Sequence, residues 1–330
     1  MNLPANFVRQ LLIIVALSIV FYGAWAAFSG IGAVWSSIVA LGWAGWSIVL
    51  GLSLLNYLLR FIRWDIYLRR LGHRVPRAPN MAVYLAGFGF TATPGKVGEA
   101  VRAVYLKPFG VTYTHGLTAF FVERLVDMLS VVVVASLAAY VFASTRWLVG
   151  LTLVAIFTCL PLVHSERLLA WLERVRQGLS PGRLHATGAK ILNMLRSSSV
   201  LLRSGPLYIG LLIGVLAWFA EGYGLYIVLA RLGADTPVLL AAGIYGVSVL
   251  AGAVSFVPGG LGGTELVMGS LLVLAGVDAP IAVSAVIICR LATLWFAVVI
   301  GLAFIIGIES GRIAKPGARA QNANIGVSGG

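Results

Sequence analysis

The chain is poor in charge. Asp, Glu, Lys and Arg make up 11% of its 330 residues, whereas soluble domains carry about 25%. Hydrophobic residues make up 60%. A soluble fold of this length leaves about a quarter of its surface in water and could not hide so much apolar area. The composition therefore excludes an ordinary soluble domain and indicates a protein whose solvent is lipid.

Cysteine and histidine are scarce as well. Cys159 and Cys289 both lie inside apolar runs, which excludes a disulfide framework and a paired zinc-ligand spacing. No two of the four histidines share a helical-turn spacing, and no nucleotide-binding motif is present. We therefore expect neither a metal site nor a cofactor. The histidines are His73, His115, His164 and His185.

Acidic residues are fewer than basic ones, which gives a net charge of +13. Most of the 24 Lys and Arg side chains border long apolar runs, as cytoplasmic loops of membrane proteins do. No basic stripe is interleaved with exposed aromatic residues, so we expect no nucleic-acid partner. The basic stretches are Arg9, 60–77, 167–203 and 312–319.

Long apolar runs are abundant, and about 20 such residues cross a bilayer core. The first run could instead be a signal peptide, because Ala24-Trp25-Ala26 imitates a cleavage site. A first spanning helix fits better, since more spans follow. The predicted spans are 11–29, 40–60, 117–143, 147–163, 206–230 and 280–308.

Two further apolar stretches are interrupted by Pro-Gly pairs. Residues 80–108 form two short arms around Pro94 and Gly95, and residues 238–277 surround Pro258-Gly259-Gly260. Arms of about 15 residues are too short to cross, so the first stretch predicts a re-entrant hairpin. The second stretch fits either a hairpin or two full spans.

The remaining segments are polar. Residues 164–205 place apolar residues at helical spacing among Arg and Lys, which predicts amphipathic helices on the membrane surface, divided at Pro181-Gly182. Residues 311–330 are rich in Gly, Ala and Asn, which predicts a disordered tail. We expect residues 1–310 to form one membrane domain.

The two halves of that domain resemble each other. The order Arg-Leu-Gly, Pro, Pro-Gly, Glu, Gly-Val, Arg-Leu occurs in about 40–143 and again in about 206–308. Counting spans from a cytoplasmic Arg9 gives the halves opposite topology and puts both termini in the cytoplasm. The predicted fold is all-α, with six to eight transmembrane helices and two inverted repeats, a pattern typical of transporters.

Several charges lie in or beside apolar segments, where each costs roughly 2.5–3.5 kcal/mol on insertion scales. They must face one another or a wet cavity. One interpretation is that these charges form buried salt bridges whose only role is to fix helix packing. We favour a polar substrate path, because apolar residues would give the same packing at a lower cost in free energy. Lys96 would meet a lipid phosphate or snorkel to the interface. The predicted path is Lys96, Glu99, Arg102, Glu123, Arg124, Asp127, Glu265 and Arg290; Glu221 is a further charge of this kind.

Four motifs in this order resemble the flippase-like, lysylphosphatidylglycerol-synthase transmembrane domain family. Thr93 to Arg102 matches that family's "TPG-x-x-GE-x-x-R" signature, and Arg60 to Trp64 matches its "R-x-x-RW" segment. Glu123 to Asp127 and Pro258 to Glu265 match two further motifs. The resemblance covers about residues 10–308. In two-domain members of that family, this module precedes a soluble aminoacyl transferase domain. The resemblance implies a module that moves the aminoacylated lipid between leaflets. We expect a stand-alone membrane module in this case, without transfer of lysine.

We therefore expect a non-enzymatic translocase of the bacterial inner membrane, which moves an amphiphilic anionic lipid or a lipid-linked headgroup between leaflets. Its partners would be membrane lipid and, as the resemblance implies, proteins of lipid or hopanoid biosynthesis. Two alternatives remain open. One is an intramembrane lipid transferase that uses Glu123 and Asp127 as acid and base. The other is a helper subunit of a lipid or glycan biosynthesis complex.

Overall fold

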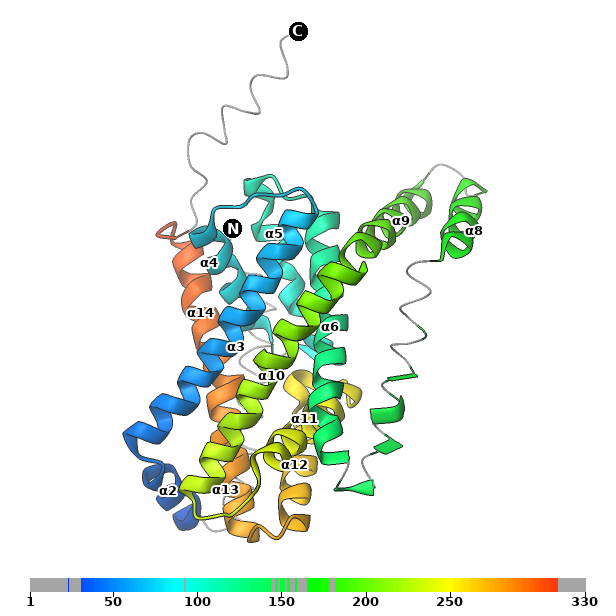
Figure 1. The fold of residues 1–330 in the computed structure, drawn as a ribbon. Helices are drawn as coiled ribbons and strands as arrows, with labels where there is room; N and C mark the ends of the chain where they lie inside the picture. The colour runs from blue at the N-terminus through cyan, green and yellow to red at the C-terminus, as the bar shows by residue number, and fades with distance from the viewer. Residues whose placement is uncertain are drawn as a thin grey trace.

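The computed structural model describes residues 31–91, 93–139, 165–178 and 182–313, together with Gly23 and short pieces between 141 and 158. Every regular element in these ranges is helical, as the composition predicts (Figure 1). The predicted helix 11–29 apart from Gly23, most of the predicted helix 147–163 and nearly all of the predicted tail lie outside the described residues.

The elements of the first half begin near the N-terminus and end at Ala139. The short segments labelled η separate or extend the α-helices. In chain order they are α2 (Ile31–Ala40), α3 (Gly42–Arg70), α4 (Arg77–Gly87), η1 (Phe88–Phe90), η2 (Pro94–Val101), α5 (Arg102–Tyr105), η3 (Lys107–Phe109) and α6 (Tyr113–Ala139).

The elements that follow include one continuous helix from Ala279 to Glu309, in which η6 is a π-helical turn. In chain order they are α8 (Glu166–Gln177), α9 (Arg183–Leu201), α10 (Ser204–Arg231), α11 (Val238–Val254), η5 (Pro258–Gly260), α12 (Gly263–Leu274), α13 (Ala279–Arg290), η6 (Leu291–Trp295) and α14 (Phe296–Glu309).

Three helices are long and apolar enough to cross a membrane: Gly42–Arg70, Ser204–Arg231 and Ala279–Glu309. Each is more than about 40 Å long at 1.5 Å per residue, against a bilayer core of about 30 Å. They coincide with three predicted spans. Helix α6 has 27 residues and comparable length, but it carries charged side chains in its middle.

One predicted boundary is wrong. The span predicted for 40–60 continues as α3 to Arg70. Its basic side chains were expected at and beyond the cytoplasmic end of the span, but Arg60 and Arg63 are 4% and 1% exposed inside the helical bundle. The helix continues because carboxylates of α6 neutralise these guanidinium groups, so they do not mark the end of the buried segment.

The helices around the two Pro-Gly breaks are short. Helix α4 has 11 residues, α11 has 17 and α12 has 12, so each is about 16–26 Å long and falls short of the bilayer core. The two breaks meet, because η2 packs against η5. The re-entrant arrangement in a membrane stays a prediction.

Equivalent positions of the predicted repeat share local backbone geometry. Gly72 and Gly233 have φ angles of 86° and 82°, and each is followed by a proline that precedes a helix. Gly110 and Gly276 have φ angles of 80° and 90°. Glycine is favoured at these positions because other residues rarely adopt this left-handed backbone. The inverted-repeat topology as a whole remains a prediction.

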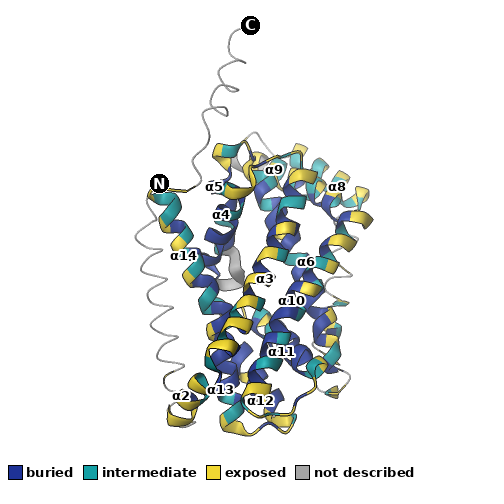
Figure 2. Cartoon of the chain, turned by 60° about the vertical axis from the view of Figure 1, so that its left-hand side comes forward, coloured by how far each residue is buried: buried dark blue, intermediate teal, exposed yellow. Residues whose placement is uncertain are grey.

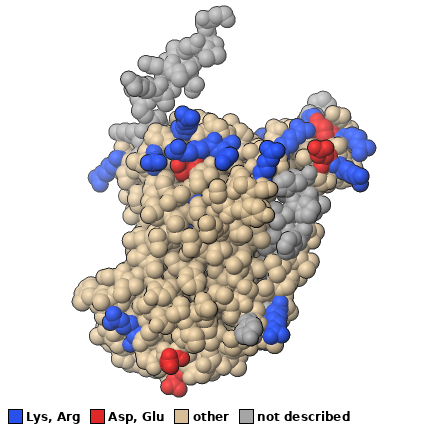
Figure 3. Space-filling view, in the orientation of Figure 1, with Lys and Arg blue, Asp and Glu red and all other residues tan. Residues whose placement is uncertain are grey.

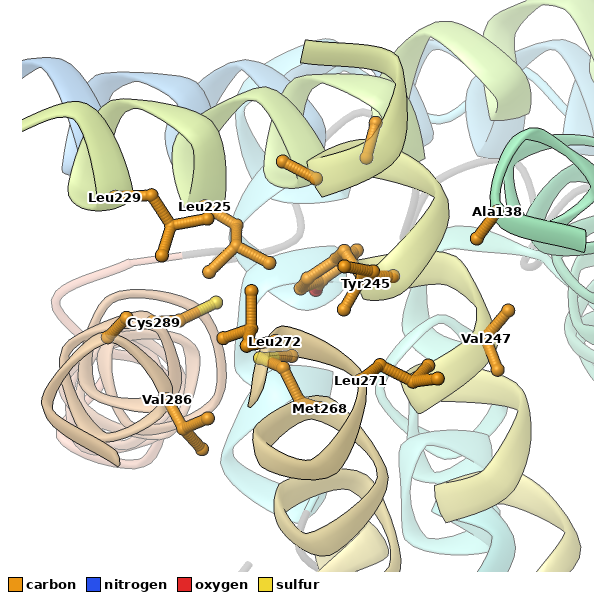
Figure 4. Close-up of a cluster of buried hydrophobic side chains, with 14 of the residues drawn as sticks. Ala138, Leu225, Leu229, Tyr245, Val247, Met268, Leu271, Leu272, Val286 and Cys289 are labelled. Atoms are coloured by element: carbon orange, nitrogen blue, oxygen red, sulfur yellow. The ribbon is translucent and has the colours of Figure 1, made fainter. Parts of the chain in front are cut away.

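One part of the interior of the bundle is an apolar, tightly packed core. Helices α3 and α10 run along each other, as do α6 and α11. A Cβ atom on Gly243 of α11 would lie 2.3 Å from the backbone nitrogen of Ala138, so glycine is needed for this close approach. Figure 4 shows side chains of α6, α10, α11, α12 and α13 in this core, and Figure 2 shows its buried residues at the centre of the bundle.

The outer surface is that of a membrane protein. Figure 3 shows a broad band without charge, and Lys and Arg side chains gathered mainly at the end that carries α4, α5, α8 and α9. We call this the basic end. Helices α8 and α9 project from it: α8 packs on α9 and α9 packs on α6, while Trp171 of α8 is 52% exposed. They occupy the stretch predicted to form amphipathic surface helices.

Candidate functional site

The centre of the site is a pair of acidic side chains one helical turn apart on α6. Glu123 and Asp127 are both fully buried. Asp127 forms ion pairs with Arg60 at 3.1 Å, with Arg124 at 3.0 Å and with Arg63. Two of these arginines come from α3, so the acidic pair joins α3 to α6.

Glu123 connects the same arginines to the first Pro-Gly break. It lies 3.1 Å from Arg102, 3.4 Å from Arg60 and 3.0 Å from Arg124. The Tyr84 hydroxyl donates to its Oε1 at 2.7 Å. Every oxygen of this buried carboxylate therefore has charged or hydroxyl partners, which offset the cost of removing it from water.

Glu99 completes this group from η2. Its carboxylate lies 2.9 Å from Arg102 and 3.6 Å from Arg124, and it accepts a hydrogen bond from Thr91 Oγ1 at 2.9 Å. Five of the eight residues predicted to share a polar path thus lie together in this first cluster, with two arginines added from α3. The cluster consists of Arg60, Arg63, Glu99, Arg102, Glu123, Arg124 and Asp127.

The first cluster carries four arginines and three carboxylates, which is a formal excess of one positive charge. Several of its polar atoms remain buried without a hydrogen bond, among them Nε of Arg60 and Nε of Arg124. Arg124 is the most exposed member, with 16% of its side chain accessible. Since unsatisfied buried donors are costly, these guanidinium groups are suited to receive an acceptor from outside the chain.

A second group surrounds the other Pro-Gly break. Arg290, at the end of α13, donates from Nε to Glu265 at 2.7 Å and from Nη2 to the carbonyl oxygen of Gly259 at 2.6 Å. Nearby, the Tyr245 hydroxyl donates to Glu221 of α10. The π turn after Arg290 carries the Thr293 carbonyl, which accepts from Tyr57 of α3 at 3.0 Å.

Both groups face one cavity of about 320 Å³. Its charged lining comes from both halves of the chain, and aromatic rings and small residues form the remainder. Glu265 is not among the lining residues and contributes through Arg290. The lining charges are Arg60, Glu99, Arg124, Asp127, Glu221 and Arg290. The aromatic lining residues are Tyr57, Phe88, Trp218, Tyr245 and Phe256.

The second predicted break lies at the cavity as well. Gly259 and Gly260 line it, with φ angles of 65° and 67°, and Pro258 begins η5. Pro94 begins η2, with Gly95 after it. Lys96 also belongs to η2, but its side chain lies outside the described residues, so its predicted contact with phosphate is untested.

Sequence reasoning missed Arg60 and Arg63 because it placed them at and beyond the cytoplasmic end of the predicted span 40–60. The signal was present in the Arg60–Trp64 motif, which resembles the "R-x-x-RW" segment. Distant pairs were also missed. His73 Nε2 lies 2.7 Å from His115 Nδ1 near the basic end, although the two are 42 residues apart. Among the described residues, no group of three His, Cys, Asp or Glu side chains could hold a metal ion.

Comparisons with known proteins match the chain to one family. The model of the lysylphosphatidylglycerol synthase TM region matches residues 10–301. A UPF0104 membrane protein from Methanothermobacter thermautotrophicus is 24% identical over 276 residues, which cover 74% of this chain and 79% of that protein. UPF0104 membrane protein PH1989 from Pyrococcus horikoshii is 22% identical over 275 residues, which cover 75% and 82%. This chain is a multi-pass membrane protein that belongs to the lysylphosphatidylglycerol synthase TM region family.

Proposed function

We propose that this protein moves an amphiphilic anionic lipid, or a lipid-linked headgroup, from one membrane leaflet to the other. The observation that carries the proposal is a cavity lined by charged side chains from both halves of a membrane protein. An ion or headgroup in a bilayer core needs such partners, because lipid tails offer none. A cavity formed between two repeats is also where transporters bind their substrates.

The charges that line the cavity balance, since three arginines face Glu99, Asp127 and Glu221, and its nitrogen donors without a hydrogen bond are what favours an anionic group. Arg60, Arg124 and Arg290 line the cavity, and Arg60 and Arg124 keep buried nitrogen atoms without a hydrogen bond. A phosphate oxygen would accept from such groups, as guanidinium–phosphate pairs do. Lys96 would add a further positive charge near the first break. The carboxylates would hold the arginines in place and exchange with the substrate as it passes.

The topology belongs to the same proposal. With the basic end in the cytoplasm, both termini would be cytoplasmic and the two repeats would be inverted. The Pro-Gly breaks would then enter from opposite faces and meet near the midplane, which is supported by the packing of η2 on η5. The energy source would be the lipid gradient or protons, since the sequence has no nucleotide-binding motif.

The test is a leaflet-resolved assay with purified protein in vesicles. Fluorescent phosphatidylglycerol and phosphatidylcholine are placed in both leaflets, and a membrane-impermeant quencher reports how fast each lipid crosses. We expect faster crossing of phosphatidylglycerol than in protein-free vesicles, and a smaller effect on phosphatidylcholine. Arg124→Gln should slow the crossing of phosphatidylglycerol. Arg231→Gln should not, because Arg231 is exposed at the C-terminal end of α10.

Equal rates with and without protein for a panel of anionic lipids would overturn the proposal. The same preparation tests the alternatives. A new lipid formed from a donor and phosphatidylglycerol would indicate a transferase instead. Variants that change only co-purification with other membrane proteins would indicate a helper subunit.

A further inference from the structure

The edge of the cavity on the side of η5 differs from its charged walls. Phe256 and Val257 line the cavity and are also 74% and 41% exposed. Val254, one turn earlier on α11, is 50% exposed. We call residues 254–257 the apolar rim. The rim is continuous with the cavity on one side and with the outer surface on the other.

Phe256 has an unusual backbone. Its φ angle is 52°, and it is the one residue other than glycine with a positive φ in the part of the chain that the structure describes. A bulky residue in this region is strained, and such strain persists where the surrounding structure enforces it, often at functional sites. A glycine would relieve the strain here, so the aromatic side chain occupies this position at a cost.

Contacts around the rim fix it against the cavity wall. The Ser255 hydroxyl donates to the Gly252 carbonyl at 2.7 Å, and the Val257 amide donates to the Ser255 hydroxyl at 3.4 Å. Beyond the rim, Arg290 holds the Gly259 carbonyl at 2.6 Å. A Cβ on Gly252 would lie 2.0 Å from Thr264 Oγ1, so α11 and α12 are in close contact behind it. The backbone is anchored, while the Phe256 side chain borders the cavity and stays largely exposed.

Charged and apolar side chains therefore line neighbouring parts of the same cavity. The interior offers guanidinium groups of Arg60, Arg124 and Arg290 to a polar ligand, and the opening beside them offers aromatic and aliphatic side chains. Exposing those side chains to water would cost about 25 cal/mol per Å² of apolar area. An apolar opening does not contribute to the binding of a water-soluble ligand. An amphiphile, in contrast, has a polar group that fits the charged interior and a hydrocarbon chain that fits the opening.

We infer that the apolar rim is a binding site for the hydrocarbon chain of an amphiphile whose polar group occupies the cavity. The chain leaves the cavity past Phe256 and continues into the surrounding bilayer. Phe256 packs against the first part of the chain and excludes polar molecules without one. This inference rests on the proposed function, because it specifies how the transported lipid binds.

The experiment maps where a lipid touches the full-length protein in bilayer nanodiscs. Two photoreactive phosphatidylglycerols are used, one with a diazirine near the start of an acyl chain and one with a diazirine on the headgroup. After irradiation, mass spectrometry identifies the labelled peptides. We expect saturable chain labelling on the peptide containing Phe256, and headgroup labelling on the peptides containing Arg124 or Arg290. Excess unlabelled phosphatidylglycerol should suppress both, and water-soluble glycerol phosphate should not suppress chain labelling.

Matched substitutions separate the rim from ordinary lipid contact. Phe256→Ala removes most of the apolar side chain and should lower chain labelling there roughly fivefold. Phe121 on α6 is also an exposed phenylalanine, at 45%, and is absent from the cavity lining, so Phe121→Ala should leave rim labelling unchanged. Thermal stability of both variants is measured to establish that they fold.

Chain labelling no higher at the rim than on the exposed face of α3, at Leu54 or Leu58, would overturn the inference. So would full rim labelling in a well-folded Phe256→Ala variant. The outcome is independent of transport. Saturable rim labelling without lipid crossing in vesicles would contradict the translocase and leave the binding site, whereas lipid crossing without rim labelling would contradict only the site.

Discussion

Arg290 holds Glu265 at 2.7 Å across 25 positions of sequence. The same guanidinium donates to the Gly259 carbonyl at 2.6 Å, so one side chain ties α13 to the start of α12 and to the second Pro-Gly break. Arg124 occupies the equivalent place in the predicted first repeat, but its surroundings differ. Glu99, Glu123 and Asp127 each contact at least one other arginine besides Arg124.

The two arginines should therefore differ in their effect on stability. Arg290→Ala breaks a buried ion pair and a backbone contact, and we expect a loss of about 3–5 kcal/mol. Arg124→Ala leaves the carboxylates with other arginines and should cost about 1–3 kcal/mol. Membrane abundance and thermal unfolding in detergent measure both. Arg69→Ala is the control, since its pair with Asp65 is at the surface. Equal losses for Arg124→Ala and Arg290→Ala would contradict this account.

A second prediction concerns pH at the basic end. Burial, and then the neighbouring His115 ring, lower the pKa of His73 from its ordinary value of 6.5. The unfolded chain therefore binds a proton at a higher pH than the folded protein does. The contribution of His73 to stability is complete above about pH 7 and decreases as the pH falls through 6.5 and then through the lower folded pKa.

Thermal unfolding between pH 5 and 8 tests this prediction. The native protein should lose stability toward pH 5, and His73→Gln should flatten part of that dependence. His115→Gln should also flatten it, because it removes the ring 2.7 Å away. His164→Gln serves as a histidine control outside the pair. An unchanged pH profile in His73→Gln would remove this histidine as the cause.

A third prediction concerns topology. Most Lys and Arg side chains on the face in Figure 3 lie at one end, and that end should face the cytoplasm. Reporter fusions after the C-terminus and near residue 185 should both report the cytoplasm. A fusion in the turn between α12 and α13, near Asp278, should report the opposite face. If the fusion near residue 185 and the one near Asp278 report the same face, the inverted arrangement is wrong.

The long apolar helices were predictable because a single apolar segment in lipid satisfies its backbone hydrogen bonds by forming a helix. The spans at α3, α10 and α13–α14 followed from length and composition alone. The end of α3 was not predictable this way. A basic residue after an apolar run usually marks the interface, and only the fold reveals that Arg63 meets Asp127, 64 positions later.

The candidate site was predictable in part for the same reason. Charges in apolar segments need partners, so Glu99, Arg102, Glu123 and Asp127 could be grouped without knowing the fold. Their pairing could not be derived, because Arg102 Nη1 reaches Glu123 across 21 positions and spacing alone says nothing about such contacts. Tyr84, Trp218 and Tyr245 were missed because aromatic residues are common in membrane helices. Only their contacts distinguish them.

The last prediction concerns the two glutamates that follow the Pro-Gly breaks. Glu99 lines the cavity and pairs with Arg102 and Arg124, while Glu265 lies behind the wall and pairs with Arg290. If these carboxylates position arginines for an anionic headgroup, their charge matters for transport. Glu99→Gln and Glu265→Gln keep the size of the side chain and remove that charge. We expect both to slow lipid crossing in vesicles. Glu265→Gln should slow it more, because Arg290 would lose this charged partner, whereas Glu123 and Asp127 still hold the arginines beside Glu99. Crossing is measured at several pH values with variants of matched thermal stability. Two well-folded variants that both move lipid at the native rate at every pH would reduce these glutamates to packing residues.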